Sequence, residues 1–257
     1  MQFQRLQWLA ACLLSICAAE ARGQSKAAPD APQHPISVTL QSGFAETFQL
    51  TLGGVFGAGP AWQNRATVSV GNLFRTGDSA ALSGFATIDT AGHHPDWLAS
   101  VSYKTRLLNR GGQQLTGTAS FERWRFPSVL RGAQDWLAGY AATYAARPGR
   151  IPVTVQSNAW TLLHSPLPKG SLVHTQVWAA HSLYGADWLN VTLRHGPQHT
   201  YAWNFYGTHG HRVLRYAGAL VLTHGKTSFE ASYRPQFGLQ QRIPDNRFWS
   251  FMLSQTF

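Results

Sequence analysis

The chain has 257 residues, of which only 12% are charged, about half the fraction usual in soluble globular proteins. Lysine and arginine outnumber aspartate and glutamate by 21 to 11, but the basic residues are scattered singly, so we expect no nucleic-acid partner. No run of 18 apolar residues follows the N-terminal region, which excludes a protein built from membrane-spanning helices.

The N-terminal residues have the pattern of an export signal. A short basic start precedes an apolar run from Trp8 to Ala19, and Ala19-Glu20-Ala21 has the small-x-small form of a cleavage site. The run is too short to span a membrane as a helix, so the sequence predicts a signal peptide over residues 1–21. Both cysteines, Cys12 and Cys17, lie within it, so the mature chain is expected to have no disulfides.

Residues 22–44 are predicted to form a flexible periplasmic leader. They are rich in alanine, proline and glutamine, and Pro29, Pro32 and Pro35 interrupt regular structure. Ile36 to Leu40 could add one short strand. The main domain is predicted to cover residues 45–257.

From Glu46 onward, apolar and polar residues alternate with a period of two, which is typical of β-strands with one apolar face. Aromatic residues recur near the segment ends, as expected for girdles at two membrane interfaces. The thirteen segments with this alternation are Phe48–Leu52, Arg65–Val70, Leu82–Ile88, Trp97–Arg106, Leu115–Glu122, Trp136–Tyr144, Val153–Leu162, Leu172–His181, Trp188–Arg194, Thr200–Tyr206, Val213–Thr223, Thr227–Gln240 and Asn246–Phe257.

The final segment ends on an aromatic residue. Trp249, Phe251, Leu253 and Phe257 share one face of the expected strand, and this ending resembles the assembly signal of bacterial outer-membrane β-barrels. The resemblance implies that the barrel-assembly machinery reads this strand. It also implies a location in the outer membrane, in contact with its lipids and lipopolysaccharide.

Together these patterns predict an all-β fold, an up-and-down antiparallel transmembrane β-barrel of about 12 strands. Thirteen segments conflict with the even number expected of such barrels, so two of the later segments should form one strand. If Ile36 to Leu40 were a further strand, the count would become 14. We prefer 12, because the longer connections near 91–95, 127–133 and 165–170 would then be extracellular.

Seven charged residues are expected to line the interior: Arg65, Lys104, Arg106, Glu122, Arg194, Glu230 and Arg234. They could form ion pairs with one another that plug the interior, which would leave a structural or interaction barrel that conducts no solute. Alternatively, five basic residues against two acidic ones would give a narrow porin-like channel a mild preference for anions, with small anionic solutes as passengers.

An outer-membrane enzyme that modifies lipids, either a hydrolase or an acyltransferase with its site at one barrel rim, is the alternative. The barrel deacylases and phospholipases carry a His-x-Ser motif, which is absent from this chain. His174 with Asp187 or Ser182 could still form a relay from different strands. No residue pattern favours catalysis over a passive role.

Eleven histidines raise the question of a metal. His209-Gly210-His211 places two imidazoles on one side of an extended segment, but zinc sites need three or four ligands in a defined geometry. We therefore expect no metal ion and no cofactor.

Overall fold

The computed structural model describes residues 34–46, 48–49, 55–56, 60–89, 96–125, 134–240, 243 and 245–257. The predicted signal peptide and the first part of the predicted leader lie outside these residues. None of the described residues belongs to a helix long and apolar enough to cross a membrane.

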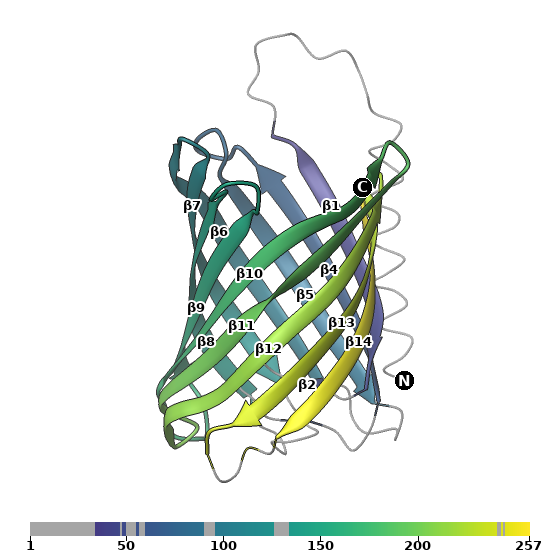
Figure 1. Ribbon diagram of the computed structural model, residues 1–257. Coiled ribbons are helices and arrows are strands. Elements are labelled where there is room, and N and C mark those ends of the chain that lie inside the picture. The colour runs from purple at the N-terminus through teal and green to yellow at the C-terminus, as the bar shows by residue number, and fades with distance from the viewer. Residues whose placement is uncertain are drawn as a thin grey trace. The chain divides into compact units, whose positions relative to one another are not determined.

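Twelve strands form a closed antiparallel barrel in chain order, and β14 pairs with β1 to close it (Figure 1). The predicted fold and the count of twelve are confirmed. The barrel strands are β1 (Ile36–Ala45), β4 (Ala61–Gly71), β5 (Ser79–Asp89), β6 (Asp96–Arg110), β7 (Gln113–Arg125), β8 (Gln134–Ala146), β9 (Val153–His164), β10 (Ser171–Ala186), β11 (Leu189–Phe205), β12 (Thr208–His224), β13 (Thr227–Gly238) and β14 (Asn246–Thr256). The short strands β2 (Phe48–Gln49) and β3 (Val55–Phe56) pair as a separate sheet.

The first barrel strand differs from the prediction. It is β1, which occupies much of the segment assigned to the leader, whereas Phe48–Gln49 forms β2 outside the barrel and residues 50–52 lie outside the described residues. The physical reason is the alternation after Pro35, since Ile36, Val38 and Leu40 share one face of β1. The barrel therefore begins at Ile36 rather than at residue 45.

The strand β11 joins two predicted segments, Trp188–Arg194 and Thr200–Tyr206, and so resolves the odd count. Gly196 and Pro197 between them have the composition of a turn. The ladder to β10 has no partner for Pro197 and resumes on either side without a shift in register. Proline, which has no N–H to donate, is tolerated there because the ladder to β10 makes no pair at this position.

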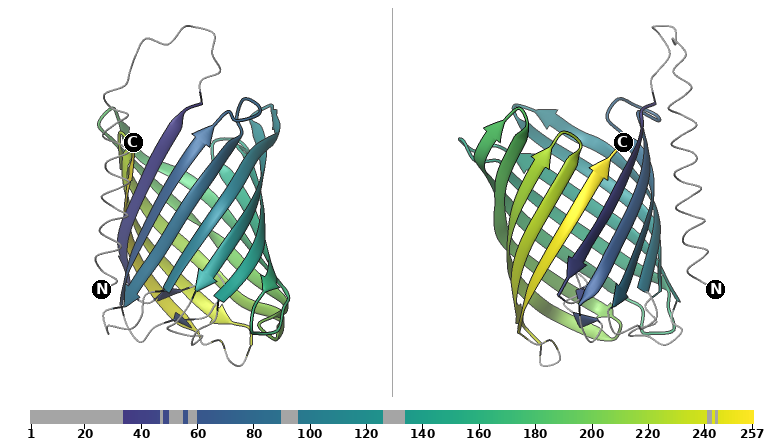
Figure 2. Two further views of the ribbon diagram at one scale, coloured as in Figure 1. Left: turned by 180° about the vertical axis from the view of Figure 1, so that it is seen from behind. Right: turned by 90° about the vertical axis from the view of Figure 1, so that its right-hand side faces the viewer.

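The connections at the two ends of the barrel differ in length (Figure 2). We call the end that carries the start of β1 and the end of β14 the terminal end, where three of the five connections are two-residue turns and the other two are residues 72–78 and 147–152. The opposite end, called the loop end, holds most of the longer connections, including residues 90–95, 126–133 and 165–170, together with the two-residue turn 206–207. This arrangement is the one expected for a twelve-stranded outer-membrane barrel.

In the terminal-end half of the barrel, outward positions on the strands are mostly apolar and inward positions are mostly polar. Leu82 and Val101 are 60% and 58% exposed, as expected of side chains that face lipid. Interior hydroxyl and amide groups hydrogen-bond across neighbouring strands. These pairs are Ser37 with Ser69 (2.8 Å), Thr39 with Thr256 (3.1 Å), Gln41 with Ser254 (3.0 Å), Thr67 with Ser83 (3.0 Å) and Ser232 with Ser250 (2.6 Å).

The turn between β4 and β5 is organised by one carboxylate. Asp78 accepts hydrogen bonds from the backbone N–H groups of Leu73 (2.7 Å), Phe74 (3.1 Å) and Arg75 (3.1 Å) and from the hydroxyl of Tyr103 (2.6 Å). Desolvation opposes ionisation, but these hydrogen bonds outweigh it and lower the pKa of Asp78. The ionised carboxylate therefore holds this turn at the terminal end.

Candidate functional site in the barrel interior

The structure places all seven predicted charged residues on the interior face of their strands. This follows from the register, in which each alternates with an outward apolar neighbour or pairs with another interior residue. Lys104 and Arg106 are exposed in the terminal-end half. The guanidinium of Arg106 packs over Gly77, whose positive φ of 88° suits glycine.

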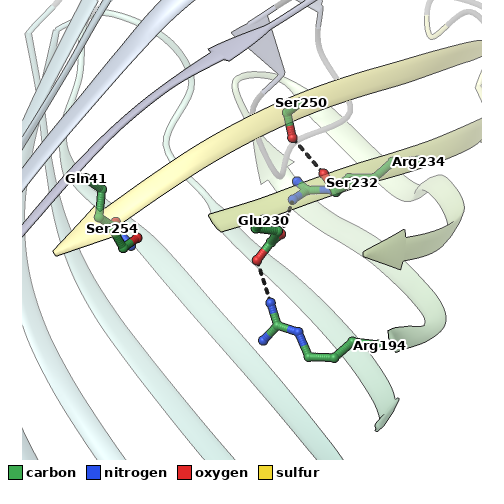
Figure 3. Close-up of polar contacts among 7 residues, drawn as sticks. All are labelled: Gln41, Arg194, Glu230, Ser232, Arg234, Ser250 and Ser254. Atoms are coloured by element: carbon green, nitrogen blue, oxygen red, sulfur yellow. Dashed lines mark hydrogen bonds and ion pairs between the residues drawn. The ribbon is translucent and has the colours of Figure 1, made fainter. Parts of the chain in front are cut away.

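The strongest charge cluster lies on β11 and β13 (Figure 3). The guanidinium of Arg194 contacts Glu230 at 2.5 Å, and that of Arg234 contacts the other oxygen of the same carboxylate at 3.7 Å. Arg194 also lies over the ring of Trp178, 5.6 Å from its centroid. Because one carboxylate serves two guanidinium groups, the cluster keeps a net positive charge.

Two further polar pairs in this wall were not predicted. Arg215 on β12 donates to the amide oxygen of Gln236 at 2.9 Å, and His174 is hydrogen-bonded to Thr200 at 2.9 Å. All four residues are buried. Arg215 escaped prediction because both faces of β12 are largely apolar, so alternation alone does not say which face is interior.

Glu122 on β7 forms a second polar centre. Its carboxylate accepts hydrogen bonds from the hydroxyl of Ser120 (2.7 Å) and from the indole N–H groups of Trp124 (2.8 Å) and Trp160 (3.1 Å). A Cβ at Gly139 on the intervening strand would lie 2.1 Å from the Ser120 hydroxyl and 2.8 Å from the carboxylate. Glycine at this position therefore allows Glu122 to reach β9.

The interior of the loop-end half is filled by apolar side chains, which we call the loop-end layer. They are at most 3% exposed and comprise Ala61, Trp124, Leu137, Leu162, Leu172, Ala202 and Phe205. Phe85, Leu98, Trp160 and Tyr206 pack against them. At the same end, interior side chains of β12 to β14 are also buried, including Val213, Arg215, Gln236 and Phe248. Buried side chains thus extend around the interior wall toward the loop end.

One hydrogen bond joins β8 to the turn between β11 and β12, beside the loop-end layer. The hydroxyl of Tyr206 donates to Asp135 at 2.5 Å, and Asp135 is 1% exposed. Burial, followed by this hydrogen bond, raises the pKa of Tyr206, so the phenol stays protonated and donates. The backbone N–H of Tyr206 also donates to Pro168 at 3.2 Å, which fixes the turn to the connection between β9 and β10.

The proposed relay is not assembled in the structure. His174 pairs with Thr200, whereas Ser182 lies farther along β10 and Asp187 lies in the turn after that strand. Other histidines lie on the outward face of β10 to β12. They form the pairs His181 with His195 (3.1 Å), His195 with Tyr216 (2.6 Å) and His199 with His211 (2.9 Å).

Within the part of the chain that the structure describes, no three His, Cys, Asp or Glu side chains are placed to hold one metal ion. His209, in the predicted His-x-His pair, instead has its imidazole 3.4 Å from the hydroxyl of Tyr201. His93 and His94 lie outside the described residues.

The predicted assembly strand is β14 with the residue that follows it. Trp249, Phe251 and Leu253 face outward and are about half exposed. The backbone N–H of Phe257 donates to the carbonyl of Val38 on β1 at 2.8 Å. The final residue therefore extends the seam between the first and last strands, and its reading by assembly machinery stays a prediction.

Comparisons with known proteins show the fold class. No family model matches the chain, and no curated protein matches it. Among solved structures, it is similar to an outer-membrane channel of Pseudomonas putida F1, with a TM-score of 0.58 and 11% identity over 91% of this chain and 100% of that one. It is also similar to the NanC porin, with a TM-score of 0.54 and 9% identity over 85% and 98% of the two chains. This chain therefore has the fold of bacterial outer-membrane β-barrels.

Proposed function

We propose that this protein spans the bacterial outer membrane as a narrow channel for small solutes, with a preference for anions. Its terminal end would face the periplasm and its loop end the exterior, in contact with lipopolysaccharide. The assembly machinery for outer-membrane barrels would insert it.

The observation that carries the proposal is the cluster of Arg194, Glu230 and Arg234. Two guanidinium groups share one carboxylate on the interior wall, and the side chains of all three residues are between 27% and 39% exposed. A purely structural plug would be expected to balance its charges, because an unpaired charge is costly in a dry interior. An excess of cations is instead suited to a wet lumen that attracts anions.

The two solved structures reported above, which are similar in fold, support the same function, since one is a channel and the other a porin. In this proposal the packed loop-end layer closes the path, so conduction requires this layer to part. The hydrogen bond between Tyr206 and Asp135 is suited to hold it shut.

The test is ion efflux from vesicles that contain the refolded protein. Vesicles loaded with potassium chloride should release chloride faster than potassium. The two rates are measured separately, each with a second path across the membrane that keeps the charge balanced. The double variant Arg106→Glu and Arg194→Glu should reverse this order. Equal rates for both ions in wild type and variant, or no efflux above that of empty vesicles, would reject the proposal.

A further inference from the structure

A polar recess opens in the interior wall beside Glu122. It has a volume of about 240 Å³ and lies between β6 and β9. It exists because β8 presents the small residues Gly139 and Ala141 to the interior, while β7 and β9 on either side carry longer side chains. The recess is a built feature of the wall rather than a gap between loops.

The lining has one consistent chemistry. Neutral hydroxyl and amide side chains dominate it, namely Ser100, Ser102, Thr118, Ser120, Gln156 and Asn158. Such groups both donate and accept hydrogen bonds. The indole of Trp160 contributes the aromatic surface, and its N–H is already directed to Glu122. Tyr140 also borders the recess, but it alternates with the inward Gly139 and Ala141 and is 59% exposed on the outward face. A ligand here would therefore meet many neutral polar groups and the ring of Trp160.

The charged residues in and around the recess favour a ligand without charge. Glu122 is its one ionisable carboxylate among the described lining residues, and none of those residues is cationic. The basic cluster with Arg194 and Arg234 lies on β11 and β13, beyond the strands that line the recess. Arg65 on β4 interacts electrostatically with Glu122, so the charge of this carboxylate is compensated and the recess presents little net charge to a ligand. An apolar molecule would leave hydroxyl groups of the lining without hydrogen-bond partners.

We propose that this recess binds a neutral, polyhydroxylated molecule of about monosaccharide size. Its volume is below the roughly 300–1,000 Å³ of pockets for drug-sized ligands, which suits a single sugar ring or a polyol. The inference rests on the proposed channel function, since the molecule would be a passenger that pauses on the wall during passage. It separates the lumen into a wall that attracts anions and a wall that holds neutral sugars.

The test measures binding without conduction. Equilibrium dialysis of radiolabelled D-glucose against the refolded protein in detergent should show one saturable site. Ala141→Leu, which fills the recess, should weaken binding at least tenfold, whereas Ala145→Leu, on the same face of β8 but outside the lining, should not. Ser102→Ala, which removes one hydroxyl without adding volume, should weaken binding about threefold.

Several outcomes would overturn the inference. These are the absence of saturable glucose binding, equal binding by wild type and a correctly folded Ala141→Leu variant, or tighter binding of D-glucuronate than of D-glucose. Glucose binding by a protein that conducts no ions would keep this site and reject the channel. Conduction without glucose binding would do the reverse.

Discussion

Replacing Glu230 with glutamine should strengthen the anion preference, because it removes the one carboxylate shared by Arg194 and Arg234. The ion-pair distances of 2.5 Å and 3.7 Å place both guanidinium groups beside this charge. A monovalent ion passing about 6 Å from the lost charge in water would change its energy by about 0.7 kcal/mol. That energy corresponds to about a threefold change in local ion concentration, raised for anions and lowered for cations.

The variant should remain folded. The side chains of Arg194 and Glu230 are 39% and 27% exposed, so solvent screening limits the contribution of their pair to about 1 kcal/mol or less. The assay is the reversal potential of the refolded protein in a potassium chloride gradient at low ionic strength, where screening is weak. Because the two ions change in opposite directions, we expect the ratio of anion to cation permeability to rise about tenfold.

The matched control is Asp187→Asn, which removes a carboxylate from the turn between β10 and β11 instead of from the interior. Its reversal potential should stay at the wild-type value. If Glu230→Gln and Asp187→Asn gave the same reversal potential, the cluster on β11 and β13 would not face the conducting path, and the reasoning would fail.

Three other predictions concern folding and assembly. Gly139→Ala should lower the free energy of unfolding in urea by about 1–3 kcal/mol, because a Cβ there overlaps side-chain oxygens; Gly84→Ala, with no atom within 4 Å of its Cβ, should not. Since the folded pKa of Asp78 is lowered, its stabilisation is complete above the ordinary carboxyl pKa and is lost as the pH falls through the folded value. Asp78→Asn should flatten that part of the stability profile, and an unchanged profile would contradict the turn geometry. Deleting Phe257 should reduce the heat-modifiable, membrane-inserted protein in cells, and normal amounts would show that assembly does not read this residue.

Much of the fold is predictable from the sequence because the alternation of apolar and polar residues has a direct geometric meaning. The interior placement of Arg194, Glu230 and Arg234 followed from that alternation alone. The error at the first strand arose because the prolines before Ile36 suggested an irregular segment, although none falls within β1. The sequence pattern divides β11 into two segments because Gly196 and Pro197 have the composition of a turn. The sequence does not show that β10 and β12 pair with β11 on both sides of these residues.

The interior contacts were less accessible to prediction. The interaction of Glu122 with Trp160 spans β8 and depends on Gly139, which shows no distinctive pattern in the sequence. The pairing of Tyr206 with Asp135 joins residues 71 positions apart. Such contacts follow from barrel closure and strand tilt, which set the neighbours of each interior side chain.

Single-channel recording in a planar bilayer tests the central claim most directly. The account predicts discrete, anion-selective openings of the wild-type protein. It also predicts more frequent openings of Tyr206→Phe, because that variant lacks the hydroxyl that ties the turn to Asp135 across the loop-end layer. Stable insertion of both proteins without any conductance would contradict the account and leave a closed barrel with a purely structural or interaction role.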